Sequence, residues 1–307
     1  PIKQKIEDIV KKIYHGDGVT FTANAEKQIK TLTELGYDKM PICMAKTQYS
    51  FTDDQTKLGA PRDFTITVRN VKVSAGAGFL VSKHGNGGSS SVSGASNVLA
   101  QHGVKFTDDE SLLRRSIEES GVCYMHAPLF AYGMKNVGPV RKALGIPTCF
   151  NILGPLLNPC RPKNSLHGTA TQGQLRLYTS IHQKTGDNFG VVTSFDGYDE
   201  ISLTSEFKVV TRLYERVYTP VEMGLKYAAP EDLYGGGTPG EAAAIFDSVL
   251  QGTATEAQRN VVIANAACGI SIMDKNLSVA DTVFMARESL ESGRALECFR
   301  KFVSINS

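Results

Sequence analysis

A run of glycines and serines that follows Lys83 and His84 carries the groups that bind phosphate. It reads Lys83-His84-Gly85-Asn86-Gly87-Gly88-Ser89-Ser90-Ser91-Val92-Ser93-Gly94. Glycines let the main chain approach an anion closely, serine hydroxyls donate hydrogen bonds, and Lys83 adds a full positive charge. A helix expected to start near Gly94 directs its partial positive charge at the same place. Because the run lies between an apolar segment and a helix, we interpret it as a phosphate-handling loop rather than a mobile surface linker.

Two adjacent carboxylates, Asp199 and Glu200, follow a strand-like segment that ends at Phe195. Magnesium in proteins takes carboxylate oxygens together with waters and substrate phosphates. The pair therefore suits a magnesium ion, although neighbouring acids in a loop are more often only solvated.

Strand-like and helical patterns alternate through the middle of the chain, and the elements that they predict must position these groups. The alternation predicts an α/β fold with a largely parallel sheet flanked by helices. Residues 74–78 and 85–94 are expected to be glycine-rich loops, separated by a short apolar bridge at 79–81. The expected strands are 41–45, 64–68, 71–73, 146–150 and 189–195, and the expected helices are 94–102, 109–120, 137–144 and 172–185.

Helical patterns also fill the last seventy residues and predict a helical carboxyl-terminal region. Thr238 is expected to cap the first of these helices, with Pro239 at its first position. The predicted helices lie near 241–251, 255–268, 279–292 and 295–303.

Composition excludes several classes of protein. The 307 residues are 41% hydrophobic, and 33 basic against 31 acidic residues give a formal charge of +2 without a basic stripe for nucleic acid. No apolar stretch has the length of a membrane span, and the first residues do not resemble a signal peptide, so we expect a cytoplasmic protein. The scattered cysteines are expected to be buried free thiols: Cys43, Cys123, Cys149, Cys160, Cys268 and Cys298.

From about residue 79 to 307 the sequence resembles the anthranilate phosphoribosyltransferase family. The Lys83-His84-Gly85-Asn86 run and the following 93–99 segment are similar to the family signature. Three further blocks follow in the family's order, and Asp196-Gly197-Tyr198-Asp199-Glu200-Ile201-Ser202 completes the set. These three blocks are His126-Ala127-Pro128-Leu129-Phe130, the 134–142 segment Met-Lys-Asn-Val-Gly-Pro-Val-Arg-Lys, and the 150–159 segment Phe-Asn-Ile-Leu-Gly-Pro-Leu-Leu-Asn-Pro.

The resemblance implies a phosphoribosyltransferase/nucleoside-phosphorylase-like fold and a role for each matching residue. Lys83 to Ser91 would contact phosphoribosyl pyrophosphate, Asn86 and Arg141 would bind anthranilate, and Asp199 and Glu200 would hold Mg2+. The implied reaction transfers the phosphoribosyl group to anthranilate and releases pyrophosphate, a step of tryptophan biosynthesis. No catalytic acid or base is assigned, and His84 is expected to bind rather than transfer a proton. The family is typically dimeric through its amino-terminal helices, so a homodimer is one option for this chain.

The first eighty or so residues depart from that family. Its G-T-G-G-D turn is absent, and its N-x-S-T phosphate-binding stretch falls on Ile66-Thr67-Val68-Arg69. The histidine normally found after the Leu129-Phe130 position is replaced by Ala131. Segments 9–19, 40–51 and 58–79 instead resemble the late part of formate tetrahydrofolate ligase, without the P-loop that binds ATP. We therefore expect a ligase-like segment over residues 1–81 and a transferase-like α/β domain over residues 82–307.

Two alternatives to an active transferase remain. One is a fragment of the ligase, which the missing P-loop disfavours. The other is a non-catalytic fusion that only binds phosphoribosyl pyrophosphate, because one wall of the phosphate site is missing.

Overall fold

The computed structural model of the chain describes residues 64–65, 74–86, 93–131, 153–186 and 188–307. Some expected elements lie outside these residues. They are strands 41–45, 71–73 and 146–150, the last three residues of strand 64–68, and helix 137–144.

The described strands form one sheet of seven strands in the order β3-β2-β1-β4-β5-β6-β7. Neighbouring strands from β3 to β5 are parallel, whereas β6 and β7 are antiparallel to their neighbours. The predicted α/β fold with a largely parallel sheet is therefore confirmed. The strands are β1 (Phe64–Thr65), β2 (Val81–Gly85), β3 (Val122–His126), β4 (Asn164–Gly168), β5 (Asn188–Ser194), β6 (Phe207–Thr211) and β7 (Glu215–Tyr218).

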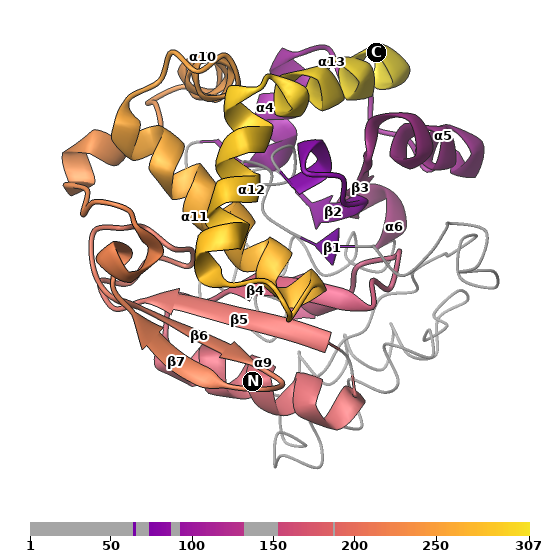
Figure 1. Ribbon diagram of the computed structural model, residues 1–307. Helices are drawn as coiled ribbons and strands as arrows, with labels where there is room; N and C mark the ends of the chain where they lie inside the picture. Colours follow the sequence, from indigo (N-terminus) through magenta and orange to yellow (C-terminus); the bar gives the residue numbers. More distant parts are fainter. Residues whose placement is uncertain (1–63, 66–73, 87–92, 132–152, 187) are drawn as a thin grey trace, which may run out of the picture.

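Helices lie on both faces of this sheet (Figure 1). α9 (Gln172–Thr185) packs against β5 on one face, and α11 (Glu256–Met273) crosses β4 and β5 on the other. α10 (Pro239–Leu250), α12 (Val279–Glu291) and α13 (Arg294–Asn306) complete the helical carboxyl-terminal region on the side of α11. The remaining short and peripheral elements are α4 (Ala95–Gln101), α5 (Glu110–Ser120), α6 (Ala127–Phe130), η2 (Gly154–Leu156), η3 (Pro220–Met223) and η4 (Pro230–Leu233).

The sequence signals for helix ends are confirmed in the carboxyl-terminal region. The Thr238 side chain accepts a hydrogen bond from the Glu241 amide, 3.1 Å away, and Pro239 is the first residue of α10. Thr255 and Gln258 form a reciprocal pair of caps at the start of α11. Such side chains satisfy amides that have no partner within the helix, and α10 starts at the residue that the Thr238 signal predicts.

The structure departs from the predicted elements in three ways. The apolar bridge was expected to end at residue 81, but the strand continues to Gly85 and so includes Lys83 and His84. Residues 74–76, expected to be loop, are helical. β3, β4, β6 and β7 were not predicted at all.

β3 was not predicted because it is buried on both faces of the sheet. Val122 and Tyr124 belong to the main core, whereas Cys123 and Met125 pack into a second cluster with α5 and α6. A strand of this kind in a parallel sheet lacks the alternation of polar and apolar residues that marks a strand with one exposed face.

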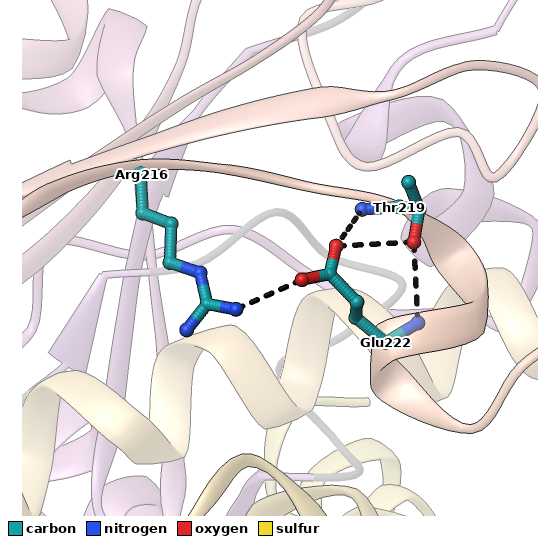
Figure 2. A network of polar contacts seen from close by, with 3 residues as sticks. All are labelled: Arg216, Thr219 and Glu222. Atoms are coloured by element: carbon teal, nitrogen blue, oxygen red, sulfur yellow. Dashed lines mark hydrogen bonds and ion pairs between the residues drawn. The ribbon is translucent and has the colours of Figure 1, made fainter.

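The outer edge of the sheet ends in a small polar network (Figure 2). After β7, one carboxylate oxygen of Glu222 accepts hydrogen bonds from the Thr219 amide at 2.8 Å and the Thr219 hydroxyl at 3.0 Å. The other oxygen accepts one from Arg216 at 2.8 Å. These bonds and the Arg216 charge lower the pKa of Glu222. The network turns the chain from β7 into η3 and back toward the core.

Phe302→Ala tests the packing of the carboxyl-terminal helices. Phe302 of α13 is 1% exposed, so its truncation should leave a cavity and lower the free energy of unfolding by about 3–5 kcal/mol. Phe284 of α12 is 67% exposed, and Phe284→Ala should change it by about 0.5 kcal/mol or less. Urea denaturation of both variants provides the measurement. Equal losses would contradict this placement of α13.

Candidate functional site

The carboxyl ends of the parallel strands bring the expected site residues to one edge of the sheet. Gly85 at the end of β2 lies beside His126 at the end of β3, and β4 and β5 end nearby at Gly168 and Ser194. The chain runs outward from β1 to β2 and β3 on one side, and from β4 to β5 on the other. Ligands in such sheets bind outside the carboxyl ends, where the strand order reverses.

Lys83 lies in β2, is partly buried, and is within electrostatic reach of Asp199. Burial lowers the pKa of its ammonium group from 10.5 to about 8, and the negative charge of Asp199 opposes that shift. The ammonium group is therefore mostly charged at neutral pH, in surroundings that strengthen its attraction for an anion.

His84 is neutral at physiological pH. Burial, followed by the positive charge of Lys83, lowers its pKa to about 4, while a hydrogen bond to the Gly154 main chain opposes the shift. Its Nε2 atom is buried and has no hydrogen-bond partner among the described residues. His84 thus offers an uncharged polar group and cannot act as a cationic acid near pH 7.

Asn158 fixes β2 to the segment that contains Gly154. Its side-chain oxygen accepts a hydrogen bond from the Ser82 hydroxyl at 3.1 Å, and its amide nitrogen donates to the Ser82 carbonyl at 3.2 Å. The same oxygen accepts from the Cys160 amide at 3.0 Å. Asn158 is 4% exposed, so these bonds are shielded from water and hold Gly154 close to His84.

A second polar chain connects β3 to the start of α4. The Ser96 hydroxyl is 2.7 Å from the Tyr124 hydroxyl and 3.0 Å from Nδ1 of His126. Phe106 stacks on the His126 ring, with 4.3 Å between ring centroids. Tyr124 also closes the space beside Gly85, since a Cβ on Gly85 would lie 3.0 Å from the Tyr124 hydroxyl.

Asp199 and Glu200 lie in the loop between β5 and β6. Asp199 is exposed and Glu200 is partly buried. The Ser194 hydroxyl donates a 2.6 Å hydrogen bond to the Glu200 carbonyl. Gly168 leaves room for this loop, because a Cβ at its position would overlap the main-chain carbonyl of Asp199. The loop therefore rests directly on the end of β4.

The structure thus describes only some of the expected site residues. Lys83, His84, Gly85, Asn86, Asp199 and Glu200 are described. Gly87 to Ser91 and Arg141 lie outside the described residues. The structure brings Lys83 and Asp199, distant in sequence, to the same edge of the sheet.

Sequence reasoning missed several residues that support the site: Ser96, Tyr124, Asn158 and Gly168. Gly168, at the end of β4, could have been noticed in the sequence, because a glycine in a strand often marks a place where another backbone approaches closely.

A magnesium ion would need more than protein ligands here. Among the described residues, no three His, Cys, Asp or Glu side chains gather into a metal site. One or two carboxylates completed by substrate phosphates is nevertheless a usual arrangement for Mg2+. Asp199 and Glu200 fit it, because Asp199 lies near Lys83, where phosphates would bind.

The helices described here are all too short or too polar to cross a bilayer.

Comparison with known proteins first defines the class. The profile described as "Glycosyl transferase family, a/b domain" matches residues 54–296. Fold and sequence therefore identify a glycosyltransferase of the α/β type.

Individual relatives then identify the family. Curated anthranilate phosphoribosyltransferases from Phocaeicola vulgatus and Bacteroides thetaiotaomicron are 54% and 50% identical over 244 residues, which are 80% of this chain and 74% of each relative. The enzyme from Thermus thermophilus has a TM-score of 0.78 at 26% identity, covering 97% of this chain and 99% of that one. This chain belongs to the anthranilate phosphoribosyltransferase family.

A solved relative also shows the fold with ligands. Anthranilate phosphoribosyltransferase from Saccharomyces cerevisiae, in complex with PRPP and Mg, has a TM-score of 0.78 at 21% identity. The superposition covers 98% of this chain and 91% of the yeast chain. At this identity the likeness shows a shared fold.

The pKa of Lys83 predicts how anion binding depends on pH. Sulfate does not titrate between about pH 6.5 and 9.5, so it probes the protein alone. Because only the protonated amine attracts it strongly, calorimetry should show binding that weakens as pH rises through about 8, by about tenfold at pH 9. Lys83→Arg keeps its charge throughout and should bind equally well across this range. The same alkaline weakening in Lys83→Arg would show that another group titrates.

Proposed function

We propose that the chain transfers the phosphoribosyl group from phosphoribosyl pyrophosphate to the amine of anthranilate, releasing pyrophosphate in tryptophan biosynthesis. One observation supports this most directly. The Lys83 ammonium group and the Asp199 carboxylate are within electrostatic reach of each other at the carboxyl edge of the sheet. A pyrophosphate–magnesium complex has the complementary charges.

The roles of individual residues are part of the proposal. Lys83 to Ser91 bind the pyrophosphate and ribose of phosphoribosyl pyrophosphate. Asn86 and Arg141 bind anthranilate, where a planar guanidinium suits the carboxylate and an amide orients the amine. Asp199 and Glu200 hold Mg2+, which would offset the charge of the pyrophosphate.

Leaving-group stabilisation dominates the proposed chemistry. Negative charge grows on pyrophosphate as its bond to the ribose breaks, and Lys83 lies in partly desolvated surroundings where such charge is strongly stabilised. A single preorganised donor of this kind contributes roughly 3 to 4 kcal/mol. His84, neutral and fixed by Gly154, positions the reactants without donating a proton. No strong general base is required.

The amino-terminal segment is proposed separately. We retain a ligase-like origin for residues 1–81 and a transferase domain over 82–307, on the sequence blocks that resemble each family. The transferase profile, however, starts at residue 54, so residues 54–81 lie within the part of the chain that matches the transferase family. β1, from this segment, also lies between β2 and β4 of the sheet. A homodimer remains a proposal that rests on the family's usual assembly.

A steady-state assay of anthranilate consumption with Mg2+ and phosphoribosyl pyrophosphate tests the function. Arg141→Ala should raise KM for anthranilate by roughly 10–100-fold, since it removes a charge-assisted pair. Asp199→Asn should lower kcat/KM by roughly 100-fold. Glu206→Gln, at an exposed carboxylate before β6, is the control and should keep wild-type rates.

Other outcomes of the same experiment distinguish the alternatives. Wild-type rates no higher than those of Asp199→Asn would defeat the catalytic proposal. Calorimetric binding of phosphoribosyl pyrophosphate without turnover would indicate a fusion that only binds it. ATP-dependent formation of formyltetrahydrofolate would indicate the ligase.

Gly168→Ala tests whether the end of β4 positions Asp199. The added methyl group would overlap the Asp199 carbonyl and must displace the loop, so kcat/KM should fall by about tenfold or more. Gly173→Ala in α9 is the matched control, because its Cβ would meet nothing closer than 3.9 Å. Kinetics of the two purified variants, with melting temperatures as a check on folding, provide the measurement. Similar rates for both would show that the loop does not depend on this contact.

A further inference from the structure

Asn265 is a buried polar residue in the middle of the apolar helix α11, and it is bonded to the loop of Asp199 and Glu200. It is 2% exposed. Its side-chain oxygen accepts a hydrogen bond from the Ile201 amide at 2.9 Å. Its amide nitrogen donates to the Ile201 carbonyl at 2.8 Å and to the Val261 carbonyl of its own helix at 2.9 Å.

One side chain therefore binds both main-chain polar groups of a single loop residue. That arrangement replaces the pairing a neighbouring strand would give to this residue. Because the bonds are shielded from water, losing them would leave a buried amide and carbonyl unpaired. The bonds fix both the position and the orientation of the peptide groups next to Glu200.

Other residues of the loop also anchor it to the core of the protein. The Ile201 and Leu203 side chains are both 0% exposed, and Leu203 has a φ of 61°, a conformation rare for a residue with a side chain. Ser194 binds the Glu200 carbonyl from the sheet side. Asp199, two residues before Ile201, remains exposed. The loop is thus held from within, while Asp199 remains exposed.

We infer that Asn265 is a positioning residue, which sets the distance of Asp199 and Glu200 from Lys83 and thereby the affinity for the magnesium complex of phosphoribosyl pyrophosphate. The inference rests on the proposed function, specifically on Mg2+ binding by Asp199 and Glu200. α11 packs against β4 and β5, so the bonds of Asn265 fix the loop relative to the sheet. Asn265 itself touches neither reactant.

Asn306 supplies a matched control for a purely structural role. It is a buried asparagine of α13, 5% exposed, and its amide donates to its own helix at Phe302, 2.7 Å away. It also donates to the Ser116 hydroxyl of α5 at 3.0 Å, on a different part of the molecule. Asn306→Leu therefore loses similar buried bonds without disturbing the loop.

The experiment measures the Mg2+ concentration that gives half-maximal binding of phosphoribosyl pyrophosphate, by calorimetry. Asn265→Leu should raise that concentration at least tenfold, with KM for anthranilate within twofold at saturating Mg2+. Asn306→Leu should keep the wild-type value, although both variants should melt at lower temperature. Asn265→Ser keeps a polar side chain that is too short to reach both groups of Ile201, and it decides the question if Asn265→Leu does not fold.

An unchanged Mg2+ midpoint in the folded Asn265 variant would overturn the inference. So would an equal change in Asn306→Leu. Asp199→Asn separates this failure from failure of the proposed function. If Asp199→Asn raises the midpoint and the Asn265 variants do not, only the positioning role is wrong. If wild-type binding does not respond to Mg2+ or Asp199→Asn has no effect, the proposed metal site is wrong and the inference fails with it.

Discussion

The candidate site depends on placing two opposite charges, the Lys83 ammonium group and the Asp199 carboxylate, within electrostatic reach of each other at the carboxyl edge of the sheet. Their attraction opposes the cost of burying the lysine, whose pKa is nevertheless lowered to about 8. β2 presents Lys83 from a strand, whereas Asp199 reaches it on a loop that rests on Gly168. The hydrogen bonds of Asn158 hold β2 in place, and those of Asn265 hold the loop that carries Asp199.

Much of this arrangement could be predicted from the sequence, because its signals are local. The helix caps Thr238 and Thr255 have their effect within a few residues of the chain, and the helices they begin were predicted. Lys83 could be singled out by the glycine- and serine-rich run that follows it, and Asp199 by its neighbouring carboxylate Glu200 and by the family block that contains both. The order of the family's blocks then implied a shared site.

What the sequence does not reveal is set by contacts between distant residues. β3 is apolar on both faces, so its pattern does not separate a strand from a buried helix. β2 extends through Lys83 and His84 because β3 pairs along its whole length, which overrides the turn signals of the glycines that follow. Asn265 looks like an isolated polar residue in an apolar helix until Ile201 is seen beside it.

β1 has a consequence for how the molecule assembles. Phe64 pairs with Val81 on one side and Asn164 on the other, so β1 lies between the β2–β3 half of the sheet and the β4–β7 half. One of its partners is close along the chain and the other is a hundred residues away. During synthesis β1 leaves the ribosome before either neighbour, since domains emerge from their amino-terminal end first. The local pair with β2 can close early, while the distant pair with β4 must wait and carries the larger loop-closure entropy. We therefore expect the two half-sheets to join at β1 late in folding, which completes the edge on which the candidate site lies.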